Sequence, residues 1–524
     1  MYHASTMSNE FHTGYQYDRC TSRGICSINP TTSALQEVIL LYLRHASYYG
    51  LKLSQNGKRD KRIEKFILNT LSILSSSYEI SEVNFGMIKF VFTKEFNSII
   101  NDFKAQFPDD KGLDTKKLLK IGDSLNENIK YGEKEFNKRI KSMPSDKRNL
   151  YRILFILIKS LSINILTYES YSKEAETEVC MVMKVLNLLN NDSNEKEELK
   201  KIILEVSKVD CKLMQKIREE QEKRYGKQRE TKVSFSTTKG RAVLVVGSNL
   251  RELENVLEQL KDTDIDVYTH DNMIIAHTFP KFSEYKNLKG QFGQGMENCL
   301  LDFSTFPGPI ILTRNSLFNV ESLYRGRLFT TDFAYSKGVI PIKNNDFSDV
   351  IKSAEDSKGF KTGKKIKPER LGYDLDSVKE KLNQKQDKGT IIIGLYGYTN
   401  EENEYFKTFF NHLSENFFTV SHSFCESDNK GICLHASGDT YSMINISEYI
   451  LNSKNNSIPI FIPYTDRHTL SVIINLSSYK NAKIFAGKWN QTVLTPNIME
   501  SLNKDFGVFE ITSPKNDIDK ISNL

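Results

Sequence analysis

The sequence predicts a multidomain protein of the α and α/β classes, with an N-terminal helical bundle followed by two doubly wound, Rossmann-like α/β domains. Three observations lead to this prediction. At 524 residues, the chain is too long for a single hydrophobic core. Nine of its twelve prolines follow residue 279, and the half before them is rich in helical periodicity. After residue 240, short apolar runs alternate with amphipathic stretches, which is typical of parallel strands covered by helices on both faces.

The first half of the chain contains apolar residues at the spacing of an α-helix. In "RIEKFILNTLSIL", Ile63, Phe66 and Ile67 are followed by two leucines on the same helical face. Residues 199–213 repeat the pattern within a charged segment. The most apolar stretch, "LYRILFILIKSLSINIL" at 150–166, is interrupted by Arg152 and Lys159, so we expect a buried helix and no membrane span. After an N-terminal segment at 1–31, the helical domain is predicted to cover 32–236.

The second half of the chain has two groups of short apolar runs. They are "AVLVVG" (242–247), "IDVYT" (265–269), "PIILT" (309–313), "TIIIGLYG" (390–397), "FFTVS" (417–421), "IPIFI" (458–462) and "AKIFA" (482–486). A basic segment around 355–385, interpreted as a linker, separates the groups, so the α/β domains are predicted at 237–383 and 384–524. Ligands of such domains bind at the carboxyl ends of the strands.

Charge and cysteine content restrict the partners and the compartment. The net charge is only +6 and the charged residues are interleaved, so no specific nucleic-acid binding is predicted. The basic clusters "GKRDKR" (57–62) and "KTGKKIKPER" (361–370) are interpreted as a solvated helix end and a solvated linker. An odd number of cysteines, seven, indicates a reducing compartment, the cytoplasm or an organelle matrix.

The turns after the first two predicted strands carry an unexpected set of polar residues. They read "GSNL" (247–250) and "THDNM" (269–273), with Ser248 and Asn272 where metal or acid–base chemistry would use a histidine or a carboxylate. His270 and His277 lie in the same region, and we expect both to be hydrogen-bonded scaffold residues.

Several motifs occur in a family-like order: "KGRAVLVVGSNLRELE", "IDVYTHDNMIIAH", "FPGPIILTRNS", "YRGRLFTTDFAYSKGVIPI", "FSDVIKSAEDSKGF", "GDTYS" and "PYTDR". With them, the chain resembles the hybrid-cluster (prismane) proteins, the hydroxylamine reductases, which are related to nickel carbon monoxide dehydrogenases. The resemblance runs from about residue 14 to the C-terminus. It implies one helical and two α/β domains, a cubane iron–sulfur cluster near the N-terminus, and a hybrid iron–sulfur–oxygen cluster where the domains meet. One histidine, two glutamates and four cysteines hold the hybrid cluster in the family.

The histidine and glutamate ligands of the family are replaced in this chain. The family's "GHDL" is "GSNL" here, which places Ser248 at the histidine position. The family's "THGEM" is "THDNM", with Asn272 for the first glutamate. The family's "WYEQK" is "PYTDR", with Thr465 for the second glutamate and Arg467 for a nearby lysine. Arg467 is expected to pair with Asp271 or Asp439.

The cysteine ligands of the hybrid cluster are replaced as well. The family's "TTNC" is "TRNS" here, with Ser316 at the position of the first cysteine. The family's "GCDG" is "GLYG", with Leu395 at the position of the second. The third cysteine aligns near Ser423, although Cys425 follows two residues later. "ASGDTYS" stands for "QCNDSYS" and gives Ser437. A hydroxyl group does not replace a thiolate as a ligand of an iron–sulfur cluster.

The N-terminal cubane motif is half present. "GYQYDRCTSRGIC" keeps Cys20 and Cys26 but has Gly14 and Tyr17 at the first pair of cysteine positions. Two thiolates cannot complete a four-cysteine site.

These replacements predict a catalytically inactive homologue, a pseudoenzyme that serves as a structural or binding subunit. Its expected partners are one or more proteins, in a larger assembly, and no cofactor is expected. The alternative is an iron–sulfur oxidoreductase of the hydroxylamine or nitric oxide reductase type. Its residual or unconventional metal centre would use Cys20, Cys26, Cys425 and Cys433. A third hypothesis is a small-molecule sensor that uses the vacated cavity.

Overall fold

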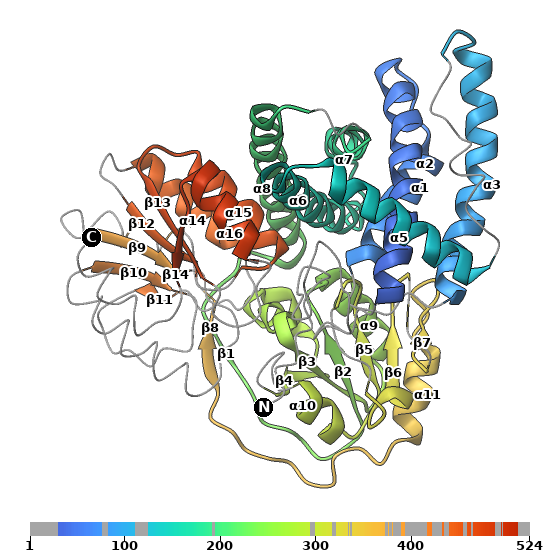
Figure 1. The fold of residues 1–524 in the computed structure, drawn as a ribbon. Helices are drawn as coiled ribbons and strands as arrows, with labels where there is room; N and C mark the ends of the chain where they lie inside the picture. Colours follow the sequence, from blue (N-terminus) through green and yellow to red (C-terminus); the bar gives the residue numbers. More distant parts are fainter. Residues whose placement is uncertain are drawn as a thin grey trace. The chain divides into compact units, whose positions relative to one another are not determined.

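The computed structural model of the chain is shown in Figure 1. It describes residues 30–75, 82–110, 124–190, 194–293, 299–316, 321–333, 335, 338–372, 376, 380, 389–393, 417–421, 432–433, 440–453, 458–462, 465–487, 494 and 496–511. The chain forms two compact units. The helical unit comprises Met7–Leu213 with Phe333–Ser336, and the two-sheet unit comprises Met1–Thr6, Met214–Asp332 and Lys337–Leu524.

The prediction of a mixed protein, rich in helices and built on parallel sheets, is confirmed. The predicted domain limits at residues 236 and 383 stay predictions. Helix α8 continues across the division between the two units, which falls between Leu213 and Met214.

The first 225 residues contribute long helices. They are α1 (Pro30–Gln55), α2 (Lys61–Ser75), α3 (Glu82–Gln106), α5 (Leu125–Ser142), α6 (Ser145–Glu169), α7 (Glu176–Leu188) and α8 (Lys196–Tyr225). Helix α1 contacts α2, α3, α5 and α7. Aromatic rings join it to α3, since Tyr42 stacks on Phe92 with a centroid distance of 4.2 Å, and Tyr49 meets Phe103 edge to face at 4.9 Å.

Helix α6 contains the apolar stretch that the sequence analysis assigned to a buried helix. Its length and composition would suit a membrane span, but 78% of the apolar window is buried inside the protein. Ile153, Leu154 and Leu157 are among its fully buried residues, and the helix contacts α2 and α7. The stretch is therefore the core of the helical unit.

The first sheet of the two-sheet unit has six parallel strands. They are β2 (Ala242–Val246), β3 (Asp266–His270), β4 (Leu288–Gln291), β5 (Ile310–Leu312), β6 (Leu328–Thr330) and β7 (Ile340–Pro341), in the order β4-β3-β2-β5-β6-β7. The described helical segments of this region are α9 (Leu250–Leu260), η1 (Asp271–Thr278), η2 (Pro280–Glu284), α10 (Cys299–Thr305), η4 (Arg325–Arg327) and α11 (Ser348–Asp356). All five residues of β2 are buried, as expected of a central strand with helices on both sides.

The second sheet repeats this topology. Its parallel strands are β9 (Gly389–Ile393), β10 (Phe417–Ser421), β11 (Ile432–Cys433), β12 (Ile458–Ile462), β13 (Ala482–Gly487) and β14 (Phe509–Ile511), in the order β11-β10-β9-β12-β13-β14. Figure 1 shows α14 (Thr440–Ser453), α15 (Arg467–Ser477) and α16 (Pro496–Phe506) beside this sheet. In chain order both sheets read 3-2-1-4-5-6, so each has a point at which the strand order reverses, between β2 and β5 and between β9 and β12.

The segment interpreted as a linker contains the end of a helix and a paired strand in its described residues, which corrects this part of the sequence analysis. Helix α11 continues to Asp356, and β8 (Glu369–Leu371) pairs antiparallel with β1 (Thr231–Val233). Phe360 anchors the segment between them, because its ring packs against Tyr268, Phe292 and Phe306 at centroid distances of 5.5–5.8 Å. This aromatic contact is long-range, so no local sequence pattern indicated it.

Candidate functional site

The carboxyl edge of the first sheet brings two predicted site positions onto neighbouring turns. The turn after β2 holds Gly247 and Ser248, and the turn after β5 holds Thr313 and Ser316. Because β2 and β5 are adjacent and the strand order reverses between them, this is the place where a doubly wound sheet forms its ligand crevice.

Gly247 allows the two turns to approach closely. Its φ is +119°, and a Cβ atom built on it would lie 2.2 Å from both the Ser316 Oγ and the Thr313 Oγ1. Only glycine adopts this conformation without strain and leaves room for both hydroxyl groups. Ser248, the next residue, is exposed.

Hydroxyl groups satisfy the carbonyl groups at the ends of the strands. The Thr313 hydroxyl donates to the Val246 carbonyl at 2.8 Å, and the Ser316 hydroxyl, only 5% exposed, donates to the same oxygen at 3.2 Å. The two hydroxyl oxygens lie 3.1 Å apart. One strand further on, the Thr330 hydroxyl donates to the Leu312 carbonyl at 3.1 Å. The carbonyls that close β2 and β5 therefore have partners within the sheet.

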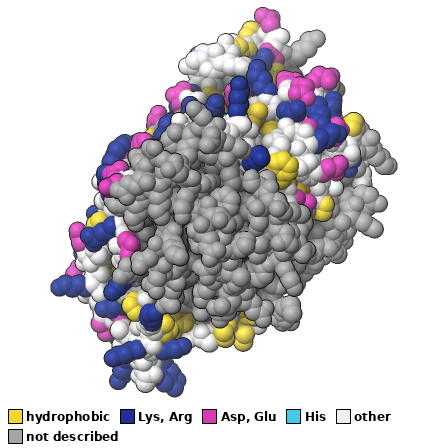
Figure 2. Space-filling view, turned by 90° about the vertical axis from the view of Figure 1, so that its left-hand side faces the viewer, with side chains coloured by type: hydrophobic (Ala, Val, Ile, Leu, Met, Phe, Trp, Pro, Cys, Tyr) yellow, Lys and Arg dark blue, Asp and Glu magenta, His cyan; other side chains and the backbone are white. Residues whose placement is uncertain are grey.

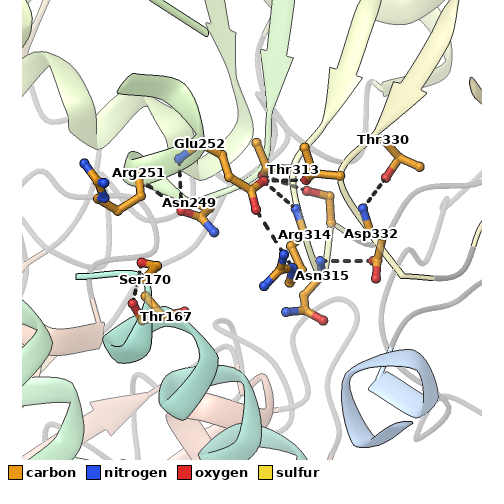
Figure 3. A network of polar contacts seen from close by, with 12 residues as sticks. Thr167, Ser170, Asn249, Arg251, Glu252, Thr313, Arg314, Asn315, Thr330 and Asp332 are labelled. Atoms are coloured by element: carbon orange, nitrogen blue, oxygen red, sulfur yellow. Dashed lines mark hydrogen bonds and ion pairs between the residues drawn. The ribbon is translucent and has the colours of Figure 1, made fainter. Parts of the chain in front are cut away.

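Glu252, in the first turn of α9, holds the turn after β5 in place. Its carboxylate accepts a hydrogen bond from the Arg314 backbone N–H at 3.0 Å and another from the Thr331 hydroxyl. The Arg314 guanidinium lies 3.9 Å away from the same carboxylate. Figure 3 shows Glu252 pointing from its helix toward Arg314. Asn249 caps this helix by accepting from the N–H groups of Arg251 and Glu252.

A second carboxylate, Asp332, holds the next residue of the same turn. Asp332 accepts from the Asn315 N–H at 3.1 Å, and its own N–H donates to the Thr330 hydroxyl at 3.1 Å (Figure 3). Asn315 has a φ of +62°, a conformation that asparagine tolerates better than most residues. Together, Glu252 and Asp332 bind two consecutive backbone N–H groups, which fixes the path of the chain leading to Ser316.

The two histidines near β3 have hydrogen-bond partners, as the sequence analysis expected. His270 is fully buried, its Nε2 lies 3.0 Å from the Asp302 carboxylate, and its ring meets Phe303 edge to face. The His277 Nε2 lies 2.8 Å from the Thr269 hydroxyl, and burial lowers the pKa of His277 to about 4. His277 is therefore neutral at physiological pH. Asn272 lies between the two histidines, in η1, and is partly exposed.

Two predicted positions lie at the corresponding edge of the second sheet. Thr465 is fully buried three residues after β12, and Arg467, 5% exposed, opens helix α15. Between them, Asp466 caps the helix by accepting from the Thr469 N–H at 2.7 Å. The predicted pairing of Arg467 with Asp271 or Asp439 stays a prediction.

The remaining predicted positions lie outside the described residues. They are Gly14, Tyr17, Cys20, Cys26, Leu395, Ser423, Cys425, Ser437 and Asp439. Cys433 lies in β11, where only the backbone is described. The described cysteines are Cys180, Cys211 and Cys299, which lie in α7, α8 and α10 and form no disulfide.

Comparison with known proteins assigns the family. The model of the Prismane/CO dehydrogenase family matches residues 16–423, more than three quarters of the chain. The chain belongs to the Prismane/CO dehydrogenase family. The resemblance to the hybrid-cluster proteins that the sequence motifs indicated is thereby confirmed.

Relatives of this prismane homologue are named hydroxylamine reductase. The protein of Acidiphilium cryptum is 28% identical over 369 residues, which cover 68% of this chain and 65% of the relative. The protein of Zymomonas mobilis is 27% identical, and the match covers 66% of that protein. The chain therefore spans slightly less than two thirds of the length of these two relatives. The protein of Natranaerobius thermophilus is 22% identical over 555 residues, with 96% of each chain covered.

Among solved structures, the chain is similar to one described as NiZn[Fe4S4] and NiNi[Fe4S4] clusters in closed and open α subunits of acetyl-CoA synthase/carbon monoxide dehydrogenase. The sequence identity is 10% and the TM-score is 0.48, over 99% of this chain and 87% of the other.

The described residues at the first-sheet edge do not fit an iron–sulfur cluster. Such clusters are held mainly by thiolates, whereas Ser248 and Ser316 offer hydroxyls and Asn272 an amide. The Ser316 hydroxyl is already bonded to the Val246 carbonyl. Within the described residues, no group of three or more His, Cys, Asp and Glu side chains is arranged to hold a metal ion.

The sequence analysis missed Glu252 and Asp332. Glu252 follows the cap residue Asn249 by three positions, which is the spacing of a capping box. This spacing predicts a bond within its own helix and not a bond to another turn. The bonds of Glu252 to Arg314 and Thr331 depend on the sheet. Asp332 lies two residues after the short strand β6, which the apolar runs did not reveal.

Proposed function

We propose that this prismane homologue is a catalytically inactive member of its family that serves as a structural or binding subunit. The observation that carries the proposal is the state of Ser316, at the position of a cysteine ligand. Its hydroxyl is buried, donates to the Val246 carbonyl and lies 3.1 Å from the Thr313 hydroxyl, on a turn whose backbone N–H groups bond to Glu252 and Asp332. These side chains bond to the backbone of the strand end and of the turn, which supports a structural use of this edge without a cluster.

The proposal includes the domain limits and the partners. We propose a helical domain to about residue 236 and two α/β domains that divide near residue 384. The partners are proposed to be proteins, in a reducing compartment, and no resident cofactor is part of the proposal. Thr465 and Arg467, at the edge of the second sheet, are proposed to have lost their cluster roles in the same way as Ser248, Asn272 and Ser316.

A second candidate is an iron–sulfur oxidoreductase of the hydroxylamine reductase type. It is favoured by the names of the relatives, which are hydroxylamine reductases at 22–28% identity. In this case Cys20, Cys26, Cys425 and Cys433 would supply the thiolates.

Iron and acid-labile sulfide in protein purified without oxygen test the proposal. We expect far less than one iron per chain, no visible absorption of an iron–sulfur cluster and no reduction of hydroxylamine with an artificial electron donor. The Zymomonas mobilis relative, purified in the same way, is the control for cluster assembly. Stoichiometric iron and sulfide that disappear in Cys20→Ala or Cys26→Ala would favour the second candidate instead.

A further inference from the structure

A two-stranded basic ribbon lies on the two-sheet unit and includes the basic cluster at 361–370. We define the basic ribbon as residues 227–241 and 358–371. The two segments pair antiparallel from Thr231 opposite Leu371 to Val233 opposite Glu369, and again at two isolated bridges, Thr237 opposite Lys364 and Gly240 opposite Phe360. If extended, the nine residue steps from Thr231 to Gly240 at about 3.3 Å each span at most roughly 30 Å.

The net positive charge of the ribbon exceeds the net charge of the whole chain. Residues 227–241 contain five basic side chains and one acidic, and residues 358–371 contain six basic and one acidic, a net charge of +9. The whole chain has a net charge of +6, so the other 495 residues together are net −3. Figure 2 shows Lys and Arg side chains gathered at the lower end of the view, the level at which Figure 1 places the segment leading into β8.

The backbone of the ribbon is held in a fixed geometry. Thr237 and Lys364 exchange two backbone hydrogen bonds of 2.9 and 3.1 Å, and Gly240 and Phe360 exchange two of 3.1 and 2.7 Å. The Ser236 side chain bonds both backbone groups of Ile366. Because Phe360 is also anchored in its aromatic cluster, the lysines are attached to an ordered frame.

Most of the lysines are exposed and form no ion pair with another described residue. Arg241 pairs with Asp264 at 3.4 Å and Lys227 with Asp376 at 3.4 Å. No ion pair with another described residue is found for the exposed side chains of Lys232, Lys239, Lys358, Lys361, Lys364 and Lys365.

We infer that the basic ribbon binds nucleic acid through its phosphate backbone, without sequence specificity. Lysines and hydroxyl groups are the usual partners of phosphates, and the exposed side chain of Thr362 lies among the lysines. A protein partner would need apolar or aromatic anchors, yet Ile366 is the one large apolar side chain exposed in the described ribbon. A single isoleucine is also too little apolar surface to insert into a membrane. This function does not depend on the proposed loss of the cluster.

The test measures binding of the full chain to a labelled duplex DNA and to a labelled single-stranded RNA, by fluorescence anisotropy over a range of salt concentrations. Six lysine contacts predict that log K falls with log salt with a slope of about −5 on duplex DNA. The variant with Lys239→Gln, Lys361→Gln, Lys364→Gln and Lys365→Gln should bind at least ~10-fold more weakly, with a slope smaller by about 3–4.

A matched variant controls for net charge. Lys65→Gln, Lys201→Gln, Lys208→Gln and Lys212→Gln remove the same number of exposed lysines from α2 and α8 and should leave binding unchanged. Thermal unfolding of both variants checks their folding. The inference is overturned if neither nucleic acid binds or if both variants weaken binding equally. Ribbon-dependent binding to polyglutamate or to anionic vesicles, without binding to nucleic acid, would also overturn it.

Discussion

At the scale of single residues, the edge of the first sheet is built from side chains that bond to its own backbone. Thr313 and Ser316 both donate to the Val246 carbonyl, and Glu252 and Asp332 accept from the next turn. A buried polar group without a partner costs about 1–3 kcal/mol, so the removal of any one of these side chains should lower the free energy of unfolding. Two substitutions separate the parts of this edge.

Glu252→Ala removes the acceptor of the Arg314 N–H and of the Thr331 hydroxyl. We expect the free energy of unfolding to fall by about 1–3 kcal/mol, measured by urea denaturation. Glu252→Gln should lose less, because the amide oxygen still accepts one hydrogen bond. Glu284→Ala, at an exposed position of η2, is the control. If Glu252→Ala is as harmless as this control, the carboxylate does not hold the turn.

Gly247→Ala tests the close approach of the two turns. The added Cβ would meet the hydroxyls of Ser316 and Thr313 at 2.2 Å, and the φ of +119° is unfavourable for alanine. Gly240→Ala is the matched control, since its φ is +140° but nothing lies within 4 Å of the added Cβ. Both should lose about 1–3 kcal/mol from backbone strain, and Gly247→Ala should lose about 1–3 kcal/mol more from overpacking. Equal losses would show that the two turns are not in contact.

At the scale of elements, the sequence predicted long helices and central strands well and short edge strands poorly. Strands β2 and β12 were visible because buried central strands are continuous apolar runs. Strand β6 has three residues and β7 has two, which is too short for a periodic signal. β1 and β8 pair although more than 130 residues separate them, so only the folded chain shows their partnership.

The link between β3 and η1 predicts an effect of pH. His277 in η1 lies against Thr269 in β3, and burial lowers the pKa of His277 from 6.5 to about 4. The unfolded chain therefore takes up a proton at higher pH than the folded chain. The stabilisation is complete above about pH 6.5 and is lost as the pH falls toward 4, because protonation then favours the unfolded state.

His277→Gln should remove this part of the acid sensitivity and keep a polar group near Thr269. Between pH 7.5 and pH 5.0, the unfolding free energy of the wild type should fall by up to about 2 kcal/mol more than that of the variant. Urea denaturation at the two pH values measures the difference. His468, whose pKa burial also lowers to about 4, is present in both proteins, so its contribution to the acid sensitivity cancels in the comparison. An identical fall in both proteins would show that His277 is not buried in its neutral form.

At the scale of the whole molecule, the sequence directed attention to single positions but did not show which partners their side chains have in the folded chain. Ser316 was identified by its motif, whereas its bond to the Val246 carbonyl joins residues that are 70 positions apart in the chain. The same holds for Asp210 in the helical unit. It is fully buried in α8 and accepts from Ser160 at 2.6 Å and from Asn164 at 2.8 Å, both in α6. No periodicity in the sequence pairs these residues.

Two compact units, each with its own buried polar cluster, predict two thermal transitions that substitutions shift separately. Asp210→Ala leaves the Ser160 hydroxyl and the Asn164 amide without this acceptor. The free energy of unfolding of the helical unit should fall by about 1–3 kcal/mol per lost partner, which lowers the midpoint temperature of its transition. Gly247→Ala should lower the transition of the two-sheet unit instead. Lys208→Ala, on the exposed side of α8, is the control for Asp210. Differential scanning calorimetry distinguishes the cases: because α8 runs through both units, a single transition that both substitutions lower equally would mean that the helix makes them unfold as one.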